Sequence, residues 1–147
     1  MLKRASRTRL ELVERLVRAG HDRGSAARVA QELKDTGVID EGAVAASLVR
    51  AAKKAGKSRG ETERLLRERG VEDSQIRAAV ESEELADDYS LALGAAREMA
   101  RRGRGARPGA LARRVLEGLA RRGFDEELAL RAAREVLGGL PSDDEGG

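Results

Sequence analysis

The apolar residues of this chain recur at spacings of three and four along almost the whole sequence. Such spacing places them on one face of an α-helix, whereas a strand against a core alternates every second residue. No segment alternates convincingly with a period of two, so the pattern predicts an all-α protein. The predicted apolar stripes are Leu12, Leu16 and Ala19; Ala26, Val29, Ala30 and Leu33; Val44, Leu48, Ala52 and Ala55; Leu85, Tyr89, Ala92, Ala96 and Met99; Val115 and Leu119; and Leu128, Ala132 and Val136.

Polar residues at the ends of the stripes indicate where helices begin. Asp40 can cap a helix that starts near Glu41. Ser58 and Glu61 form a capping-box pattern, in which the two side chains accept from free backbone N–H groups. Pro108 suits a first helical turn, because its missing N–H would have no partner there.

Three glycines, Gly20, Gly70 and Gly123, mark an internal repeat. The chain reads LVERLVRAGHD at 12–22, TERLLRERGVE at 62–72 and VLEGLARRGFD at 115–125. Each glycine suits the left-handed residue that ends a helix, and the acid two residues later suits the start of the next one. The glycines are 50 and 53 residues apart, which leaves room for about three short helices of roughly 11–12 residues each.

These spacings predict tandem three-helix repeats that form an elongated, curved right-handed-helix array. The predicted segments are repeat 1 at 1–56, repeat 2 at 57–105, a shortened repeat 3 at 106–138 and a disordered acidic tail at 139–147. The sequence RRGRGARPG at 101–109 interrupts the apolar pattern and predicts a flexible basic loop between repeats.

Composition narrows the class of protein. Tyr89 and Phe124 are the only aromatic residues, so the helix interfaces must be built from Leu, Val, Ile and Ala. The absence of cysteine excludes disulfides and thiol chemistry. No apolar stretch reaches the roughly 18 residues that a membrane span needs, and the basic start MLKRASRTRL lacks the apolar core of a secretory signal. We therefore expect a cytoplasmic protein with no membrane partner.

The net charge of +3 is divided into blocks of opposite sign. Residues 50–70 carry a local charge of +5, residues 71–90 carry −6, and residues 101–122 carry +7. Cations are ordinary at helix ends, so for the first block a structural role weighs as much as contact with phosphates or acidic side chains. The candidate partner-binding or DNA-binding residues are Arg50, Lys53, Lys54, Lys57, Arg59, Arg64, Arg67, Arg101, Arg102, Arg104, Arg113, Arg114, Arg121 and Arg122.

Signals of an enzyme are largely missing. His21 is the only histidine, and its place in the repeat matches that of Phe124, so we expect a half-buried packing residue and no catalytic base. No phosphate-binding G-x-x-x-x-G-K-[ST] loop occurs, and RGRGARPG lacks the strand and helix of a dinucleotide site. We predict no catalytic residue and no cofactor.

Two pairs of acids, Glu83-Glu84 and Asp87-Asp88, have the i, i+4 spacing that can hold a divalent ion. A solvated helix start, where carboxylates favour the positive end of the dipole, explains them more simply. We therefore predict no metal site.

The sequence resembles the RecX family of bacterial recombination regulators over roughly residues 8–137. The third-repeat segment LARRGFDEEL at 119–128 fits the family pattern best. Val44 and Leu48 stand where the family usually has aromatic residues, and residues 57–59 replace an aromatic-Gly-Pro turn. The matching residues of the middle segment are Asp40, Glu41, Val49, Arg50, Gly56, Leu66, Arg69, Gly70 and Val71.

The resemblance implies a non-enzymatic monomer that binds the RecA protein filament, with single- or double-stranded DNA as a further partner. It would inhibit the recombination, ATPase and coprotease activities of RecA, and so act in DNA repair and the SOS response. Two alternatives remain open. The +5 and +7 blocks suit a helical nucleic-acid-binding module that acts independently of RecA. The replaced aromatic residues suit a diverged scaffold or adaptor.

Overall fold

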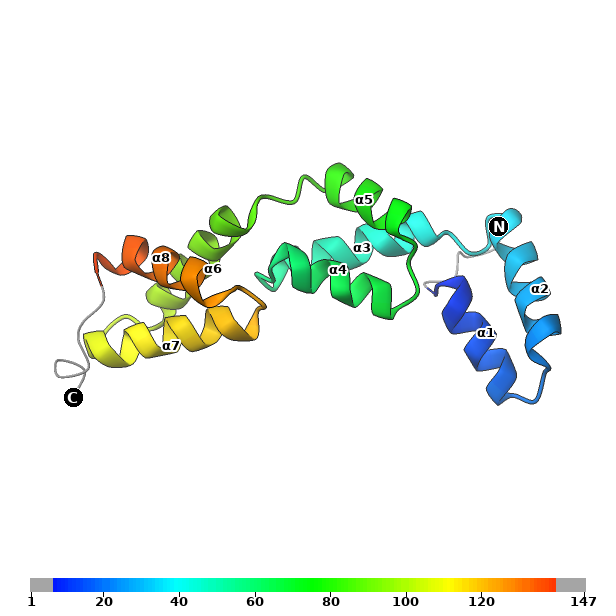
Figure 1. Ribbon diagram of the computed structural model, residues 1–147, viewed down its shortest axis with the longest axis horizontal. Helices are drawn as coiled ribbons and strands as arrows, with labels where there is room; N and C mark the ends of the chain where they lie inside the picture. The colour runs from blue at the N-terminus through cyan, green and yellow to red at the C-terminus, as the bar shows by residue number, and fades with distance from the viewer. Residues whose placement is uncertain (1–6, 140–147) are drawn as a thin grey trace. The chain divides into compact units, whose positions relative to one another are not determined.

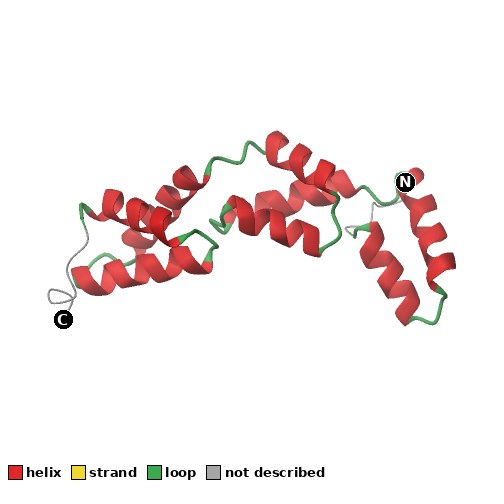
Figure 2. Ribbon diagram, in the orientation of Figure 1, coloured by secondary structure: helices red, strands yellow, loops and turns green. Residues whose placement is uncertain are grey.

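The computed structural model describes residues 7–139, and these form eight α-helices joined by short turns (Figures 1 and 2). The all-α prediction is therefore confirmed. The tail predicted for 139–147 lies outside the described residues, apart from Gly139. The helices are α1 Arg9–Arg18, α2 Arg23–Asp35, α3 Glu41–Lys54, α4 Arg59–Glu68, α5 Asp73–Ser82, α6 Asp88–Arg102, α7 Pro108–Arg121 and α8 Glu126–Leu137.

The predicted helix starts are confirmed by hydrogen bonds at the first turns. The Asp40 carboxylate accepts from the Ala43 N–H at 3.0 Å, directly before α3. The Ser58 hydroxyl accepts from the Glu61 N–H at 3.1 Å at the start of α4. Pro108 is the first residue of α7. Short polar side chains thus satisfy backbone donors that the helix itself leaves free.

The three repeat glycines end α1, α4 and α7 in the same way. Gly20, Gly70 and Gly123 have φ values of +105°, +87° and +94°. The N–H of the following residue donates to the carbonyl five residues earlier: His21 to Leu16 at 3.0 Å, Val71 to Leu66 at 3.0 Å and Phe124 to Leu119 at 3.2 Å. This is the Schellman helix ending. The sequence repeat is therefore a repeat of one helix ending followed by a new helix.

Several stripe positions were predicted wrongly. Ala19 is exposed because α1 ends at the residue before it, and Val29 and Ala55 are exposed as well. Leu85 is buried but precedes α6, and its N–H closes the end of α5, with Glu84 at φ +50° where glycine is usual. Apolar spacing shows a face, but it does not show where the helix bearing that face ends.

The loop predicted at 101–109 is shorter than expected. Helix α6 continues through Arg102 and α7 begins at Pro108, so the connection is confined to residues 103–107. Arg101 and Arg102 both pair with Glu98 one turn earlier, which favours continuation of the helix.

The described chain divides into two compact units. Unit 1 is the described part of 1–51 together with 62–85, and unit 2 is 52–61 together with the described part of 86–147. Helices α3 and α4 contribute to both units, so the limits of the units do not coincide with those of the predicted repeats. The repeat limits at 56 and 105 stay a prediction.

The core of unit 2 is made largely of alanine. Ala96, Ala132 and Ala133 are fully buried between α6, α7 and α8, beside Val115 and Leu119. Small side chains let helix backbones approach closely, but each buries little apolar area. The scarcity of aromatic residues therefore shows directly in the packing, and other interactions must help to hold the helices together.

A contact between helix ends supplies such an interaction in unit 1. The hydroxyl of Thr8, which begins α1, donates to the Arg69 carbonyl at the end of α4, and Thr8 is fully buried. The Arg69 guanidinium donates to both carboxylate oxygens of Glu11, at 2.8 and 2.9 Å. Thr8 and Glu11 also form a capping box on α1. Thr8 and Glu11 thus cap the start of α1 and also bind Arg69 at the end of α4.

Unit 2 contains the equivalent contact. The N–H of Ser58, which begins α4, donates to the Arg122 carbonyl at 2.9 Å, and Ser58 is 1% exposed. In both units the acceptor directly precedes a C-cap glycine. We call this arrangement the helix-end joint: Thr8 with Arg69 in unit 1 and Ser58 with Arg122 in unit 2.

The C-cap glycines also give the joint its space. A Cβ on Gly70 would lie 2.6 Å from the Leu10 Cβ, and a Cβ on Gly123 would lie 2.7 Å from the Glu61 Cβ. Glycine is therefore required for two reasons at these positions: the positive φ and the close approach of the neighbouring helix. At Gly20 a Cβ would meet nothing within 4 Å.

An acid at the start of the third helix completes each joint. The Glu41 carboxylate of α3 accepts from the Arg9 N–H of α1 at 2.7 Å. The Asp88 carboxylate of α6 accepts from the Arg59 N–H of α4 at 2.8 Å. Glu41 is 3% exposed, and Lys34 Nζ lies 3.4 Å from its second oxygen, so its charge is balanced inside unit 1.

The substitution Gly70→Ala should destabilise unit 1 more than Gly20→Ala. A positive φ costs an alanine about 1–2 kcal/mol at either position. At Gly70 the contact with Leu10 adds the overpacking cost of ~1–3 kcal/mol. Urea unfolding followed by circular dichroism, with amide hydrogen exchange to assign the loss to unit 1, measures both. Equal losses in the two variants would show that the close approach is unimportant.

The substitution Glu11→Gln should lower stability at neutral pH but not in acid. Hydrogen bonds from Arg69 are the main cause that holds the pKa of Glu11 below its usual 4.5. The stabilisation is therefore complete above that usual value and is lost as pH falls through the lowered one. Because the pair is partly solvent-exposed, we expect a difference of only about 1 kcal/mol at pH 7. Urea unfolding at several pH values should show it shrinking in acid, whereas Glu14→Gln, at an exposed position of α1, should show no such trend.

Candidate functional site

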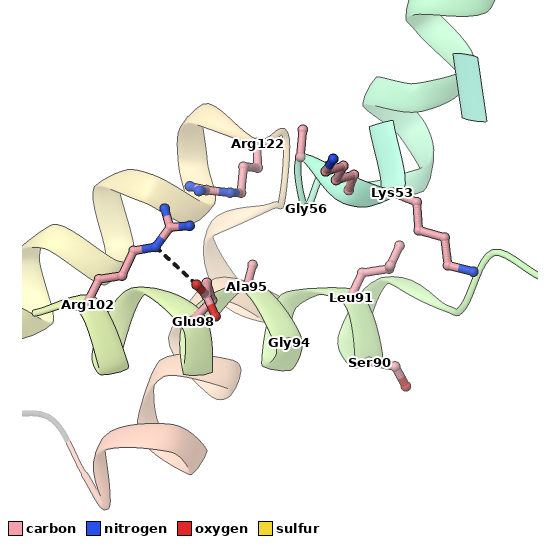
Figure 3. Close-up of a pocket in the computed structure, with 11 residues that line it drawn as sticks. Lys53, Gly56, Ser90, Leu91, Gly94, Ala95, Glu98, Arg102 and Arg122 are labelled. Carbon is pink, nitrogen blue, oxygen red and sulfur yellow. Dashed lines mark ion pairs between the residues drawn. The ribbon is translucent and has the colours of Figure 1, made fainter. Parts of the chain in front are cut away.

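A pocket of about 350 Å³ lies in unit 2, between the end of α3, the middle of α6 and the end of α7 (Figure 3). Its small residues, among them Gly56, Gly94 and Ala95, leave room between the longer side chains. Four cations and one carboxylate line it, which gives a formal charge of +3: Lys53, Lys54, Arg102, Arg122 and Glu98. We call this the basic pocket.

The helix-end joint holds Arg122 in place. The Arg122 carbonyl accepts from the Ser58 N–H. The Arg122 guanidinium donates to the Gly118 carbonyl at 2.9 Å and lies 3.4 Å from the Met99 sulfur. These contacts fix both the backbone and the side chain of Arg122. A fixed cation loses less side-chain entropy on binding an anion than a flexible one does.

Gly56 lines the pocket beside Arg122, in the turn after α3. Its φ is +71°, and the Lys57 N–H closes the turn on the Ala52 carbonyl at 3.0 Å. A Cβ on Gly56 would lie 3.3 Å from the Arg122 Nε and 3.5 Å from the Ala95 Cβ. Glycine therefore keeps this side of the pocket open next to Arg122.

Glu98 is the single acid that lines the pocket. It lies 3.0 Å from the Arg102 Nε on the same helix (Figure 3). It also accepts from Arg101, one residue earlier on that helix. The hydrogen bond from Arg101 is the main cause that holds the pKa of Glu98 below its usual value. Glu98 is therefore ionised at neutral pH and neutralises part of the cationic charge.

The other predicted cations are not gathered in this pocket. In unit 1, Arg50 pairs with Glu83 at 2.5 Å, Arg64 pairs with Glu68 at 3.0 Å, and Arg67 lies 3.1 Å from Asp73. These three form ordinary ion pairs on the surface of unit 1. Lys57 and Arg59 belong to the turn before α4 and to its first residue, outside the pocket lining.

Unit 2 carries a further set of exposed arginines away from the pocket. Arg104 lies in the turn before α7, Arg113, Arg114 and Arg121 lie on α7, and Arg101 ends α6 beside Glu98. Apart from Arg101, these side chains have no ion-pair partner within residues 7–139.

The interpretation of His21 as a half-buried residue is wrong. His21 is exposed, not half-buried, although its backbone closes the end of α1 as Phe124 closes the end of α7. A matching place in a helix ending does not bring a matching burial. No helix within the described ranges is long and apolar enough to cross a bilayer.

The acidic pairs serve helix ends. Asp87 caps α6 and Asp88 is its first residue, so the predicted helix start is confirmed for this pair. The hydrogen bond that Asp88 accepts from the Arg59 N–H of α4 was not predicted. Glu83 and Glu84 instead follow the last turn of α5, so the prediction of a helix start is wrong for them. Among residues 7–139, no group of three or more His, Asp or Glu side chains is placed to hold a metal ion.

The pocket residues that sequence reasoning missed are Glu98, Gly56 and Gly94. Of these, only Glu98 could have been predicted, because it precedes Arg102 by four residues and would face it on a helix. A second, mainly apolar pocket of about 370 Å³ was also unforeseen. It lies between α7 and α8 and is lined by residues that include Leu116, Phe124 and Leu130.

The fold and the pocket define an all-helical protein with a repeated helix ending and a cationic pocket. Among curated proteins, the regulatory protein RecX of Mycobacterium sp. (strain KMS) is 31% identical over 144 residues, which cover 95% of this chain and 79% of that protein. RecX of Thermobifida fusca (strain YX) is 32% identical over 139 residues, with coverages of 93% and 75%. The chain therefore belongs to the RecX family of regulatory proteins.

Other comparisons agree with this assignment. RecX of Halorhodospira halophila is 36% identical over 85 residues, so the chain spans about half the length of that relative, at 53%. A crystal structure of a regulatory protein RecX matches with a TM-score of 0.63 and 25% identity, and covers 90% of this chain and 63% of that one. RecX from Lactobacillus salivarius shares the fold, with a TM-score of 0.63 at 19% identity over 88% of this chain and 85% of that one. No family model matches the chain.

Two helical glycines of unit 2 should respond oppositely to substitution by alanine. At Gly94, which lines the basic pocket, a Cβ would meet nothing within 4 Å, so Gly94→Ala should stabilise the protein by roughly 0.5–1 kcal/mol. At Gly118 a Cβ would overlap the Met99 sulfur, so Gly118→Ala should destabilise it. Urea unfolding measures both. A loss of stability in Gly94→Ala would contradict the open pocket wall.

Proposed function

We propose that this chain binds the RecA recombinase filament and inhibits its recombination, ATPase and coprotease activities. Membership of a family of regulatory proteins supports a role in regulation. The observation that carries the choice of surface is the basic pocket, where four cations converge against one acid. The chain would act by binding alone, as a cytoplasmic monomer, without a reaction or cofactor of its own.

The basic pocket is the proposed contact with RecA. Its cations lie at the ends of α3 and α6 and directly after α7. The alanine core packs α6 against α7, and the helix-end joint binds Ser58, in the segment that follows α3, to Arg122. A concave cationic site attracts an acidic protein surface and speeds the encounter, and its contribution falls as salt is added. The ion-paired residues Arg50, Arg64 and Arg67 would contribute less, because binding must first break their existing pairs.

The exposed arginines of the turn before α7 and of α7 suit a second role. Arg104, Arg113, Arg114 and Arg121 can contact phosphates without losing an ion pair within the described chain. This observation favours a DNA contact beside the RecA contact, and it is also what a nucleic-acid-binding module independent of RecA would need. The two functions differ in whether RecA responds when the pocket is altered.

Reversal of charge in the pocket tests the proposal. The variant Lys53→Glu/Lys54→Glu changes two pocket cations and should weaken inhibition of RecA ATP hydrolysis on single-stranded DNA about tenfold, which corresponds to ~1.4 kcal/mol. Reversal of Arg50 in addition should add little, because Arg50 already pairs with Glu83. The measurement is the ATPase rate of the cognate RecA across a titration of each variant.

Arg113→Glu/Arg114→Glu is the matched control, since it makes the same change of charge at two residues that are exposed in unit 2 but outside the pocket. It should leave the ATPase inhibition nearly intact and reduce the salt-dependent anisotropy change of labelled DNA. An unaltered protein that fails to affect RecA in stoichiometric excess, yet binds DNA with a steep salt dependence, would refute the proposed function and favour the independent nucleic-acid module.

A further inference from the structure

We infer that Glu98 is an internal occupant of the basic pocket, and that the pocket binds a carboxylate of an acidic peptide segment, which displaces Glu98 from Arg102. The inference rests on the proposed function only in taking RecA as the source of that segment. The peptide site itself rests on the contacts within unit 2.

The position of Glu98 is that of a bound anion. Its carboxylate lies in the pocket lining, 3.0 Å from the Arg102 Nε, and it also accepts from Arg101, which lies outside the lining. The Glu98 side chain is 38% exposed and that of Arg102 is 76% exposed, so an incoming carboxylate can reach the guanidinium. A surface pair of this kind is weak, and exchange of one carboxylate for another costs little.

Charge allows a further anion even while Glu98 is present. Lys53, Lys54, Arg102 and Arg122 leave the lining with a formal charge of +3 after Glu98 is counted. The carbonyl end of α3 opposes an anion with only about half a negative charge. Lys54 has no ion-pair partner within residues 7–139, and so offers a cation that no internal acid neutralises.

The lining favours a peptide over a nucleic acid. Besides the charged residues it consists of Ala55, Gly56, Ser90, Leu91, Gly94 and Ala95. None of these is aromatic, so the pocket lacks the aromatic stacking surface that sites for single strands usually have. Two guanidinium groups can each receive a carboxylate through paired hydrogen bonds, and the small residues leave space for an extended backbone.

If the Glu98 carboxylate competes with a peptide carboxylate for Arg102, removal of the charge of Glu98 must strengthen peptide binding. Glu98→Gln should tighten the binding of an acidic peptide about two- to fivefold, as expected for the loss of one or two weak internal ion pairs. Arg102→Gln should weaken binding, and in that background Glu98→Gln should have much less effect, because the group for which the carboxylates compete is gone.

The test is a titration of the ¹⁵N-labelled full chain with a blocked ten-residue peptide of alternating glutamate and glycine, followed by amide chemical shifts. We expect saturable shifts at Gly56, Gly94 and Arg122. The same peptide with glutamine should produce none. Glu117→Gln, which removes an exposed acid of α7 outside the pocket, is the control for net charge and should not tighten binding.

Three results would overturn the inference. The first is equal tightening by Glu98→Gln and Glu117→Gln, which would reduce the effect to overall charge. The second is shifts that spread over Arg113 and Arg114 or fail to appear. The third is saturable chemical shifts of the pocket amides with a ten-nucleotide oligothymidylate but not with the peptide, which would show that the pocket binds nucleic acid.

The proposed function can fail separately. Specific peptide binding by a chain that does not inhibit RecA would leave the peptide site standing and refute RecA as its target. Conversely, strong inhibition of RecA without any peptide binding would keep the proposed function and refute the displacement of Glu98.

Discussion

The structure depends on one physical constraint, which is that the ends of short helices must have their backbone groups satisfied. The start of α1 binds the end of α4, and the start of α4 binds the end of α7. The buried hydroxyl of Thr8 reaches the Arg69 carbonyl in unit 1, and the N–H of buried Ser58 reaches the Arg122 carbonyl in unit 2. Each polar group that is buried without a hydrogen-bond partner would cost roughly 1–3 kcal/mol. The same contact that satisfies one helix end therefore fixes the position of the next helix.

This constraint matters more because the cores are thin. Much of the buried surface of unit 2 comes from alanine, which contributes far less hydrophobic free energy than a leucine or phenylalanine would. Alanine and glycine compensate by letting backbones approach closely, and close approach brings polar helix ends within hydrogen-bonding distance of one another. The acids at the start of α3 and α6, Glu41 and Asp88, belong to the same system, since each accepts from the first N–H of another helix.

The basic pocket is a product of the joint in unit 2. Arg122 contributes its carbonyl to the joint and its guanidinium to the pocket, so the element that orders the helices also orders a binding group. Gly56 keeps the space beside it open. The aromatic-Gly-Pro turn that the family resemblance leads one to expect is absent at 57–59, but the backbone N–H of Ser58 in that segment still makes the structural contact. The fold of this chain therefore does not require an aromatic-Gly-Pro turn at these positions.

The sequence by itself determined the helices, most of their starts and the repeated ending at Gly20, Gly70 and Gly123, because capping and periodicity are local properties. It also supported the RecX family assignment through order and spacing. Only the folded structure shows which charged residues share a pocket, because Lys53, Glu98 and Arg122 come from distant parts of the sequence. It also decided that Arg50, Arg64 and Arg67 are paired on the surface of unit 1, and that His21 is exposed while Phe124 is buried. A charge block along a chain shows how much charge is present, but only the folded backbone determines the distances between the charges, and electrostatic energy depends on those distances.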